Sequence, residues 1–264
     1  MKFLTLLAVL VAFGAANGRA GQATNQSAAA GESASSRKAE LEHARLLLAR
    51  KDYLLAAAAF EQVLRYDPND AQVLNQACVA RLQLGELDRA EHLCKRAVRA
   101  DKHLGSAVNN LGAIAYSNRR YGKAIRCYRK ALSLGADKAA VWANLGYAYY
   151  AAQKYPEAMD AFGKALALNP RVLEENAAVG PLAEQHAAAN LGMLDFLLAK
   201  SYAQAGDAQH TAEYLKLARD SGYKDLASAE KDPAFAKVIQ DPRVQEVLHP
   251  PPASSPEQKT PGSN

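Results

Sequence analysis

The chain has 264 residues, of which 49% are hydrophobic and 22% are charged, and it contains 16 glycines and 11 prolines. This composition is typical of a globular protein with its own core, and it excludes a disordered chain, a collagen and a small disulfide-rich domain. Aromatic residues make up only 7% of the sequence while alanine-rich runs recur, as in closely packed helices. The formal net charge of +5 is too small to indicate binding of nucleic acid, which is not predicted as a partner.

Residues 1–20 have the layout of a secretory signal peptide. Lys2 precedes an apolar run over 3–13, and small residues then offer cleavage sites after Ala16 and Ala20. This run of 11 residues is shorter than the roughly 18 to 20 that a bilayer-spanning helix needs, and no comparable run follows. We therefore expect an exported protein, periplasmic or secreted, that is not transmembrane once processed. A short membrane anchor is the alternative.

Two polar segments flank the rest of the sequence. Residues 21–36 consist mainly of Gly, Ala, Ser, Thr, Asn and Gln, and they lack the large apolar side chains whose burial would repay ordering. Residues 249–264 contain five prolines among polar residues. The first segment is predicted to be a flexible linker and the second a disordered, proline-rich tail.

Between these segments the sequence repeats with a period of 34 residues. Gly146 and Gly112 lie one period apart, and further steps of 34 residues reach Cys78 and Ala44. A series of alanines and a mostly aromatic series keep the same spacing: Ala56, Ala90, Ala124 and Ala158, and Phe60, Cys94, Tyr128 and Phe162. A fixed period of this length predicts an array of similar units. Their bounds are 37–70, 71–104, 105–138 and 139–172.

The fourth unit carries the most complete motif. Its residues are Trp142, Leu145, Gly146, Tyr149, Ala158, Phe162, Ala165 and Pro170. This pattern resembles the tetratricopeptide repeat, a helix-turn-helix unit of the same length. The resemblance implies an all-α fold, a right-handed superhelical solenoid of helical hairpins. It also implies that Gly146 and Ala158 stand where paired helices approach closely.

Other parts of the array depart from this motif. In the second unit, Cys78 stands at the small position and Arg81 stands where tyrosine is preferred. Residues 173–191 are an insertion, which we interpret as a loop over 171–180 followed by an extension of the next helix. Residues 192–225 fit a degenerate fifth unit, as terminal repeats often are.

Residues 226–248 are predicted to form a short helical cap. Asp232-Pro233 and Asp241-Pro242 each begin a short apolar segment. Aspartate is a favoured N-cap residue, and proline is favoured in the first helical turn. The segment is similar to the terminal segment of many exported bacterial repeat proteins. Because an open solenoid end needs a cover, we expect these helices to close the array.

Motifs for catalysis and metal binding are lacking. The six histidines form no helical ligand pair, and no phosphate-binding loop, nucleophile elbow or dinucleotide fingerprint occurs. Neither a cofactor nor a metal is predicted, and the protein is not expected to be an enzyme. The alternative, an envelope hydrolase or lyase, would depend on Glu174, Glu175 and Glu184. Adjacent Glu174 and Glu175 point in different directions on a helix, so they are poor acid-base partners.

Two of the three cysteines fall within one predicted hairpin. Cys78 occupies the small position of the first helix, and Cys94 lies on the inner face of the second. In an oxidising compartment these two can form a disulfide that does not include Cys127. Three small buried side chains are the alternative, and the sequence leaves both open.

The first candidate surface is a groove. In the tetratricopeptide architecture, the first helices of successive hairpins line a concave groove that can hold a peptide or protein partner. The residues expected there, here called the ladder, are Arg45, Asn75, Asn109, Asn110, Tyr116, Asn144, Tyr147 and Tyr150. At the positions of Asn110 and Asn144 the family often uses asparagine to hold neighbouring turns. Replacing Tyr147 and Tyr150 with Ala is expected to weaken partner capture without unfolding.

The second candidate surface is basic. Ten Lys and Arg residues and one Asp occur between residues 95 and 130. By repeat position most of them lie on second helices and face outward. The predicted convex patch consists of Lys95, Arg96, Arg99, Arg119, Arg120, Lys123, Arg126, Arg129 and Lys130. Such a patch suits an acidic protein, anionic lipid head groups or an anionic envelope polymer. A merely solvated basic face is the alternative.

These features predict a non-catalytic scaffold or adaptor of the cell envelope that binds a protein or peptide in the concave groove. The resemblance names no partner, because one repeat scaffold hosts many functions. A self-assembling structural protein, associating through the ends of the array, stays open beside the hydrolase or lyase alternative.

Overall fold

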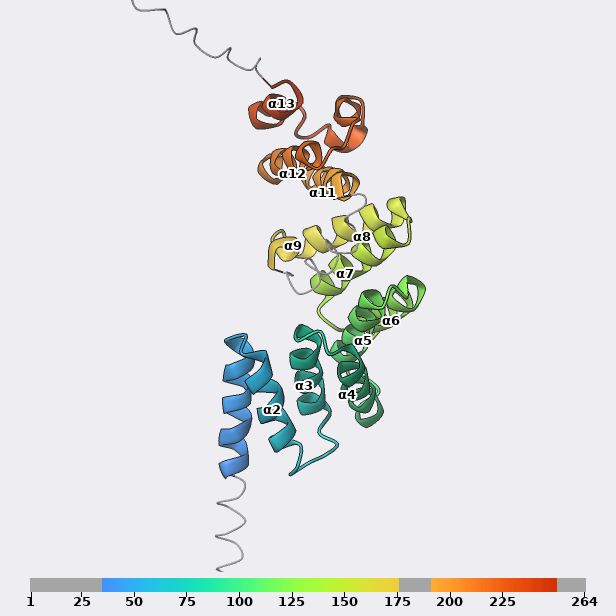
Figure 1. Cartoon of the computed structure of the whole chain (residues 1–264). Coiled ribbons are helices and arrows are strands. Elements are labelled where there is room, and N and C mark those ends of the chain that lie inside the picture. The colour runs from blue at the N-terminus through green and yellow to red at the C-terminus, as the bar shows by residue number, and fades with distance from the viewer. Residues whose placement is uncertain (1–34, 176–190, 251–264) are drawn as a thin grey trace, which may run out of the picture. The chain divides into compact units, whose positions relative to one another are not determined.

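The computed structural model describes residues 35–175 and 191–250, and every regular element in them is helical (Figure 1). The predicted all-α array of helical hairpins is thereby confirmed. The signal peptide, residues 21–34 of the linker, most of the insertion and the tail after residue 250 lie outside the described residues. None of the described helices has the length and apolar character needed to cross a membrane.

The chain divides into two compact units, Met1–Lys102 and His103–Asn264, and each is described by itself. The helices of the first unit are a helix over residues 35–49, α2 (Tyr53–Val63), α3 (Ala71–Gln83) and α4 (Leu87–Ala100). α3 packs against both α2 and α4. Asp70 caps α3, since its carboxylate accepts hydrogen bonds from the backbone N–H groups of Gln72 and Val73.

The second unit continues the same alternation of helices. Its α-helices up to the insertion are α5 (Gly105–Ser117), α6 (Tyr121–Ser133), α7 (Lys138–Ala151), α8 (Tyr155–Leu168) and α9 (Val172–Glu175). After the insertion come α11 (Leu191–Ala205), α12 (Ala208–Asp220), η1 (Leu226–Glu230), η2 (Pro233–Phe235) and α13 (Pro242–Leu248). Neighbouring helices pack in chain order, with α11 against α8 across the insertion.

Helix α9 corrects the loop expected over 171–180. Val172 and Leu173 are buried, and α9 contacts both α7 and α8. The burial of two large apolar side chains stabilises a helical turn that the polar flanking sequence does not suggest.

A left-handed backbone conformation marks the turn inside each hairpin. Lys51, Gly85, Arg119 and Gln153 have φ values of 64°, 74°, 57° and 60°, and they recur every 34 residues. Gly206 has the same conformation in the last hairpin, with φ 85°. The backbone thus follows the period read from the sequence, even where the turn residue is not glycine.

A small residue facing a large one closes each of the third and fourth hairpins. A Cβ atom added to Gly112 would lie 2.6 Å from the ring of Tyr128, and one added to Gly146 would lie 2.6 Å from the ring of Phe162. Real side chains do not tolerate such distances, so glycine is required for this approach. Tyr128 and Phe162 are fully buried as a result.

The cap forms at the end of the array as the Asp-Pro pairs predict. The carboxylate of Asp232 accepts from Ala234 N at 2.9 Å, and that of Asp241 accepts from Arg243 N at 3.0 Å. Phe235 and Val244 are fully buried in one cluster with Leu215 of α12. The cap therefore covers the apolar face of the last hairpin.

Candidate functional site

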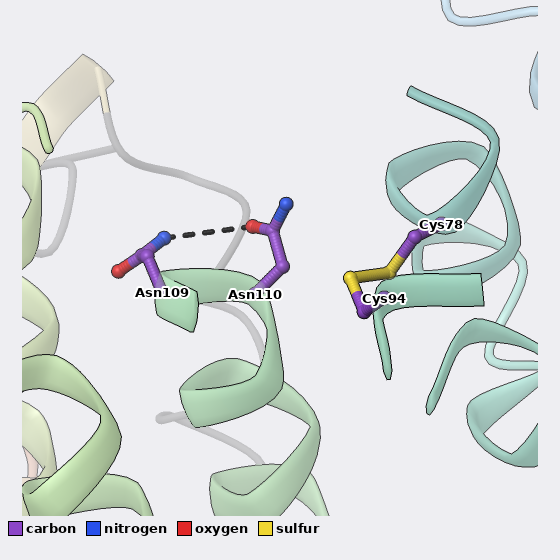
Figure 2. Close-up of a disulfide and its surroundings, with 4 residues drawn as sticks. All are labelled: Cys78, Cys94, Asn109 and Asn110. Atoms are coloured by element: carbon purple, nitrogen blue, oxygen red, sulfur yellow. Dashed lines mark hydrogen bonds between the residues drawn. A yellow bond between two sulfur atoms is a disulfide. The ribbon is translucent and has the colours of Figure 1, made fainter. Parts of the chain in front are cut away.

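A disulfide closes the second hairpin. Cys78 of α3 and Cys94 of α4 are bonded, with 5.5 Å between their Cα atoms, and both are fully buried (Figure 2). Cys78 lies one period before Gly112 and two periods before Gly146. Cys94 lies one period before Tyr128 and two periods before Phe162. The bond thus takes the place of the glycine–aromatic contact. The sequence left this pairing open, and the structure forms it, with Cys127 outside the bond.

Three asparagines of the ladder hydrogen-bond to each other. Nδ2 of Asn144 on α7 donates to Oδ1 of Asn109 on α5 at 3.1 Å. Nδ2 of Asn109 in turn approaches Oδ1 of Asn110 at 3.5 Å (Figure 2). The row links first helices of neighbouring hairpins, the structural role that the resemblance implies for Asn110 and Asn144. Asn109 and Asn110 are half-buried, so they also remain partly accessible.

The ladder contains both exposed and buried residues, which corrects the expectation that all of them line a groove. Arg45 is exposed and forms an ion pair with Glu42. The residues at most 8% exposed are Asn75, Tyr116, Asn144, Tyr147 and Tyr150. Side chains buried to this degree pack the array and cannot line an open groove, although binding by the accessible positions stays a prediction.

The tyrosines are buried because each meets another aromatic ring. The ring of Tyr147 lies edge-on to Phe162 with 5.0 Å between centroids, and Tyr150 lies 5.7 Å from Tyr155. Burial raises the pKa of the Tyr150 phenol to about 12. Replacing these tyrosines with Ala removes buried rings, so it is expected to destabilise the fold, contrary to the expectation from sequence.

The α4 part of the convex patch is partly neutralised or engaged. Lys95 pairs with Glu91 one turn earlier, at 3.0 Å, and Arg96 donates through Nη2 to the backbone carbonyl of Pro68. Arg99 is exposed. The count between residues 95 and 130 missed Glu91 because this acid precedes that window. These three residues belong to the first unit, so their merging with the other patch residues stays a prediction.

The α6 part of the patch is a strongly basic helix face. Arg119 and Arg120 precede the helix, and Lys123, Arg126, Arg129 and Lys130 lie on it. All but the half-buried Lys123 are exposed, and α6 contains no acidic residue. Within the described ranges, the five exposed residues make no ion pair. We call these six residues the α6 basic face.

A histidine joins two carboxylates beside the insertion, and sequence reasoning missed it. Nδ1 of His210 lies 2.6 Å from Asp207 Oδ2, and Nε2 lies 2.8 Å from Glu174 Oε1. Burial opposes the charged imidazole, but the bonds and charges of the two acids outweigh it and raise the pKa of His210. Burial opposes the charge of Asp207 as well, and the backbone and side-chain bonds from His210 lower its pKa.

This cluster bears on the enzymatic alternative. Glu174 is engaged by His210, while Glu184 lies outside the described residues. In the part of the chain that the structure describes, no group of three or more His, Cys, Asp or Glu side chains is arranged to hold a metal. The contact between His210 and the N-cap Asp207, three residues earlier, could have been predicted from sequence. The contact with Glu174 could not, because it depends on the packing of α9.

Comparison with known proteins places this architecture in a family. A model of the family described as the Tetratricopeptide repeat protein 21 C-terminal ARM domain matches residues 22–175. The chain belongs to this family. The tetratricopeptide resemblance read from the fourth unit is therefore confirmed at the level of the family.

Two relatives of this tetratricopeptide-type chain match shorter stretches. Small glutamine-rich tetratricopeptide repeat-containing protein 2 of Mycosarcoma maydis is 29% identical over 87 residues, which are 33% of this chain and 25% of that protein. Tetratricopeptide repeat protein 21A of Mus musculus is 29% identical over 94 residues, or 36% of this chain and 7% of that protein. The chain thus covers a quarter or less of the length of these relatives.

Solved structures share the fold. The structure of pilF from Pseudomonas aeruginosa aligns with a TM-score of 0.51 at 20% identity, over 81% of this chain and 92% of that one. A chain of the APC/C hetero-tetramer Cut9-Hcn1 aligns with a TM-score of 0.51 at 19% identity, over 77% of this chain and 36% of that one. At such identities the likeness establishes the helical-repeat fold alone.

Proposed function

We propose that this protein is a non-catalytic interaction scaffold of the cell envelope, and that it holds an acidic surface of a protein partner against the α6 basic face. The observation that carries the proposal is this helix face, where five exposed Lys and Arg side chains lie together without an acidic residue on α6. Packing of the array does not require them, because α6 buries Ala124, Tyr128 and Ala131 on its opposite side.

Electrostatics gives such a face a binding role. Like charges on one helix face repel each other when they have no counter-charge, and an acidic partner relieves that repulsion. A complementary potential mainly accelerates association and selects partners. The membership of the chain in a tetratricopeptide-type family supports a protein as the partner, and the accessible asparagines Asn109 and Asn110 supply further hydrogen-bonding groups.

Two observations support export. Residues 1–20 have the pattern of a signal peptide, and Cys78 bonds to Cys94. Structural disulfides persist in oxidising compartments and are rare in the cytosol. A periplasmic or secreted location accounts for both features.

The proposal is tested by crosslinking in living cells of the native host, using the tagged full-length precursor and mass spectrometry. A photoreactive residue placed on α6 at position 122, where Gly122 is exposed, should capture one reproducible partner. The charge reversals Arg126→Glu and Arg129→Glu should abolish that capture.

The matched control reverses two exposed lysines of the last hairpin and its exit, Lys216→Glu and Lys224→Glu. This variant has the same net charge change and should retain capture. Equal capture by both charge-reversed variants would show that the α6 basic face does not bind the partner. Crosslinks only between copies of this protein would favour self-assembly instead.

A further inference from the structure

A basic cavity lies in the first unit, between α2, α3 and α4. Its volume is about 670 Å³, which is within the range of ligand sites. Four arginines line it, together with two acids, so the lining carries a net charge of +2 before His92 is counted. The arginines are Arg65, Arg81, Arg89 and Arg96, and the acids are Glu61 and Asp88.

Arg81 forms a fixed charged wall of this cavity. Its side chain is only 8% exposed, and its guanidinium pairs with Glu61 at 2.5 Å and with Glu86 at 3.0 Å. Arg89 also pairs with Glu86, at 3.1 Å. Because these two arginines are already compensated by carboxylates, they shape the cavity more than they attract a ligand.

The attractive groups are the other basic side chains. Arg96 donates to the carbonyl of Pro68, a neutral acceptor that leaves the charge of the guanidinium uncompensated. The side chains of Arg65 and His92 are exposed, and within the described residues these side chains make neither a hydrogen bond nor an ion pair. Two cationic side chains and an imidazole therefore face the cavity with unused donors.

An equivalent cavity in the second unit shows that this charge is not required by the packing. It lies between α8 and α11, its volume is about 640 Å³, and none of the described residues that line it is Lys or Arg. By the repeat register, Gly163 and Ala167 there correspond to Glu61 and Arg65, and Tyr202 corresponds to Arg81. The repeat fold thus leaves a hollow at both places, and only the sequence of the first unit makes its hollow basic.

We propose that the cavity between α2, α3 and α4 binds an acidic segment of a protein partner, with carboxylates on Arg65 and Arg96 and an apolar side chain against Leu64 and Leu93. Both leucines line the cavity beside the arginines. Guanidinium groups bind carboxylates through two parallel, charge-assisted hydrogen bonds, which favours this occupant. The inference rests on the proposed function for the nature of the partner, but it concerns a separate surface.

The test uses the purified, oxidised full chain and a fluorescent peptide in which Glu and Leu alternate within a Gly-Ser frame. The control probe is the same peptide with Gln in place of Glu. The double variant Arg65→Gln with Arg96→Gln should lose about tenfold or more in affinity for the Glu peptide, because two charge-assisted hydrogen-bonded contacts are lost. The matched variant Lys216→Gln with Lys224→Gln removes the same charge from exposed positions outside both proposed surfaces and should lose far less.

Arg65→Gln alone keeps the proposal testable if the double variant is unstable, because Arg65 has no partner in the described structure whose loss could unfold it. This variant should also bind the Glu peptide more weakly. Equal losses in the cavity variant and in the Lys216→Gln with Lys224→Gln control, or equal binding of the Glu and Gln probes, would overturn the proposal. Displacement of the Glu peptide by inorganic phosphate at constant ionic strength would overturn it too, in favour of a site for a small free anion.

This assay and the crosslinking in cells can fail independently. Loss of the preference for the Glu peptide together with intact capture at α6 overturns the cavity alone. Intact preference without any captured partner overturns the proposed function alone.

Discussion

The second and fourth hairpins differ in what holds their two helices together. At two equivalent positions, the hairpin α3–α4 has Cys78 and Cys94, and the hairpin α7–α8 has Gly146 and Phe162. In α7–α8 a buried ring lies against a glycine. In α3–α4 two small side chains leave no ring to fill this space, and a covalent bond joins the helices.

This difference extends beyond the cysteines. The second hairpin also has Arg81 where the tetratricopeptide pattern prefers tyrosine, and Arg81 is held by Glu61 and Glu86. The second hairpin has therefore exchanged aromatic packing for a disulfide and a network of ion pairs. A buried ion pair contributes little net stability by itself, so the disulfide is expected to carry much of the stabilisation.

The largest expected effect is in the fourth hairpin. Phe162→Ala should lower the free energy of unfolding by about 3–5 kcal/mol, because a fully buried ring leaves a cavity between α7 and α8. Urea denaturation measures this effect. The control Leu168→Ala, at a residue that is 54% exposed on the same helix, should change stability little. A small effect of Phe162→Ala would mean that the ring is not the main contact of this hairpin.

The next effect is in the second hairpin. Cys78→Ala combined with Cys94→Ala opens a loop with a sequence separation of 16 residues, which should cost about 3 kcal/mol. Reductant should destabilise the native chain and leave this double variant unchanged. Cys127→Ala retains the disulfide and should retain the response to reductant. An unchanged stability of the native chain in reductant would contradict the stabilising role of the disulfide in the second hairpin.

The glycine of the fourth hairpin gives a smaller effect with an internal control. Gly146→Ala places a methyl group 2.6 Å from Phe162 and should cost about 1–3 kcal/mol. Gly163→Ala on α8, where a Cβ atom meets nothing within 4 Å, should raise the free energy of unfolding by up to about 1 kcal/mol. The same sign for both changes in urea denaturation would contradict the requirement for close approach.

The smallest effect concerns the turns of the two hairpins, where exchanging the residues should reverse their contributions. Gly85 and Gln153 have φ values of 74° and 60°, a region that costs a residue with a Cβ atom about 1 kcal/mol. Gly85→Gln should therefore destabilise by about 1 kcal/mol, while Gln153→Gly should stabilise by less than that, since glycine also gains freedom in the unfolded chain. Calorimetric melting of both variants checks the two signs.

The array was predictable from sequence because its determinants are local and periodic. Gly146 and Ala158 indicate a close helix pair, and the Asp-Pro pairs at 232–233 and 241–242 indicate helix starts. Two long helices of the structure correspond to each predicted repeat, with starts that lie up to two residues before the predicted bounds. The four-residue helix α9 was not predicted, because its stability comes from Val172 and Leu173 packing against α7 and α8.

The candidate surfaces were less predictable, because exposure depends on tertiary contacts. A ladder built from repeat position cannot show that Tyr147 meets Phe162 or that Asn144 bonds to Asn109. The His210 cluster needs Glu174, which precedes it by 36 positions in the chain. The basic composition of α6 was visible in the sequence, whereas its lack of described ion pairs required the structure.

The most direct test of this account asks whether the chain works outside the cytosol as an oxidised scaffold. Cells of the native host are quenched in acid, and the denatured protein is labelled with a thiol-reactive polyethylene glycol and resolved by mass. A closed second hairpin predicts one label per chain, on Cys127, and three labels after reduction. Three labels without reduction would contradict both the closed second hairpin and the exported location.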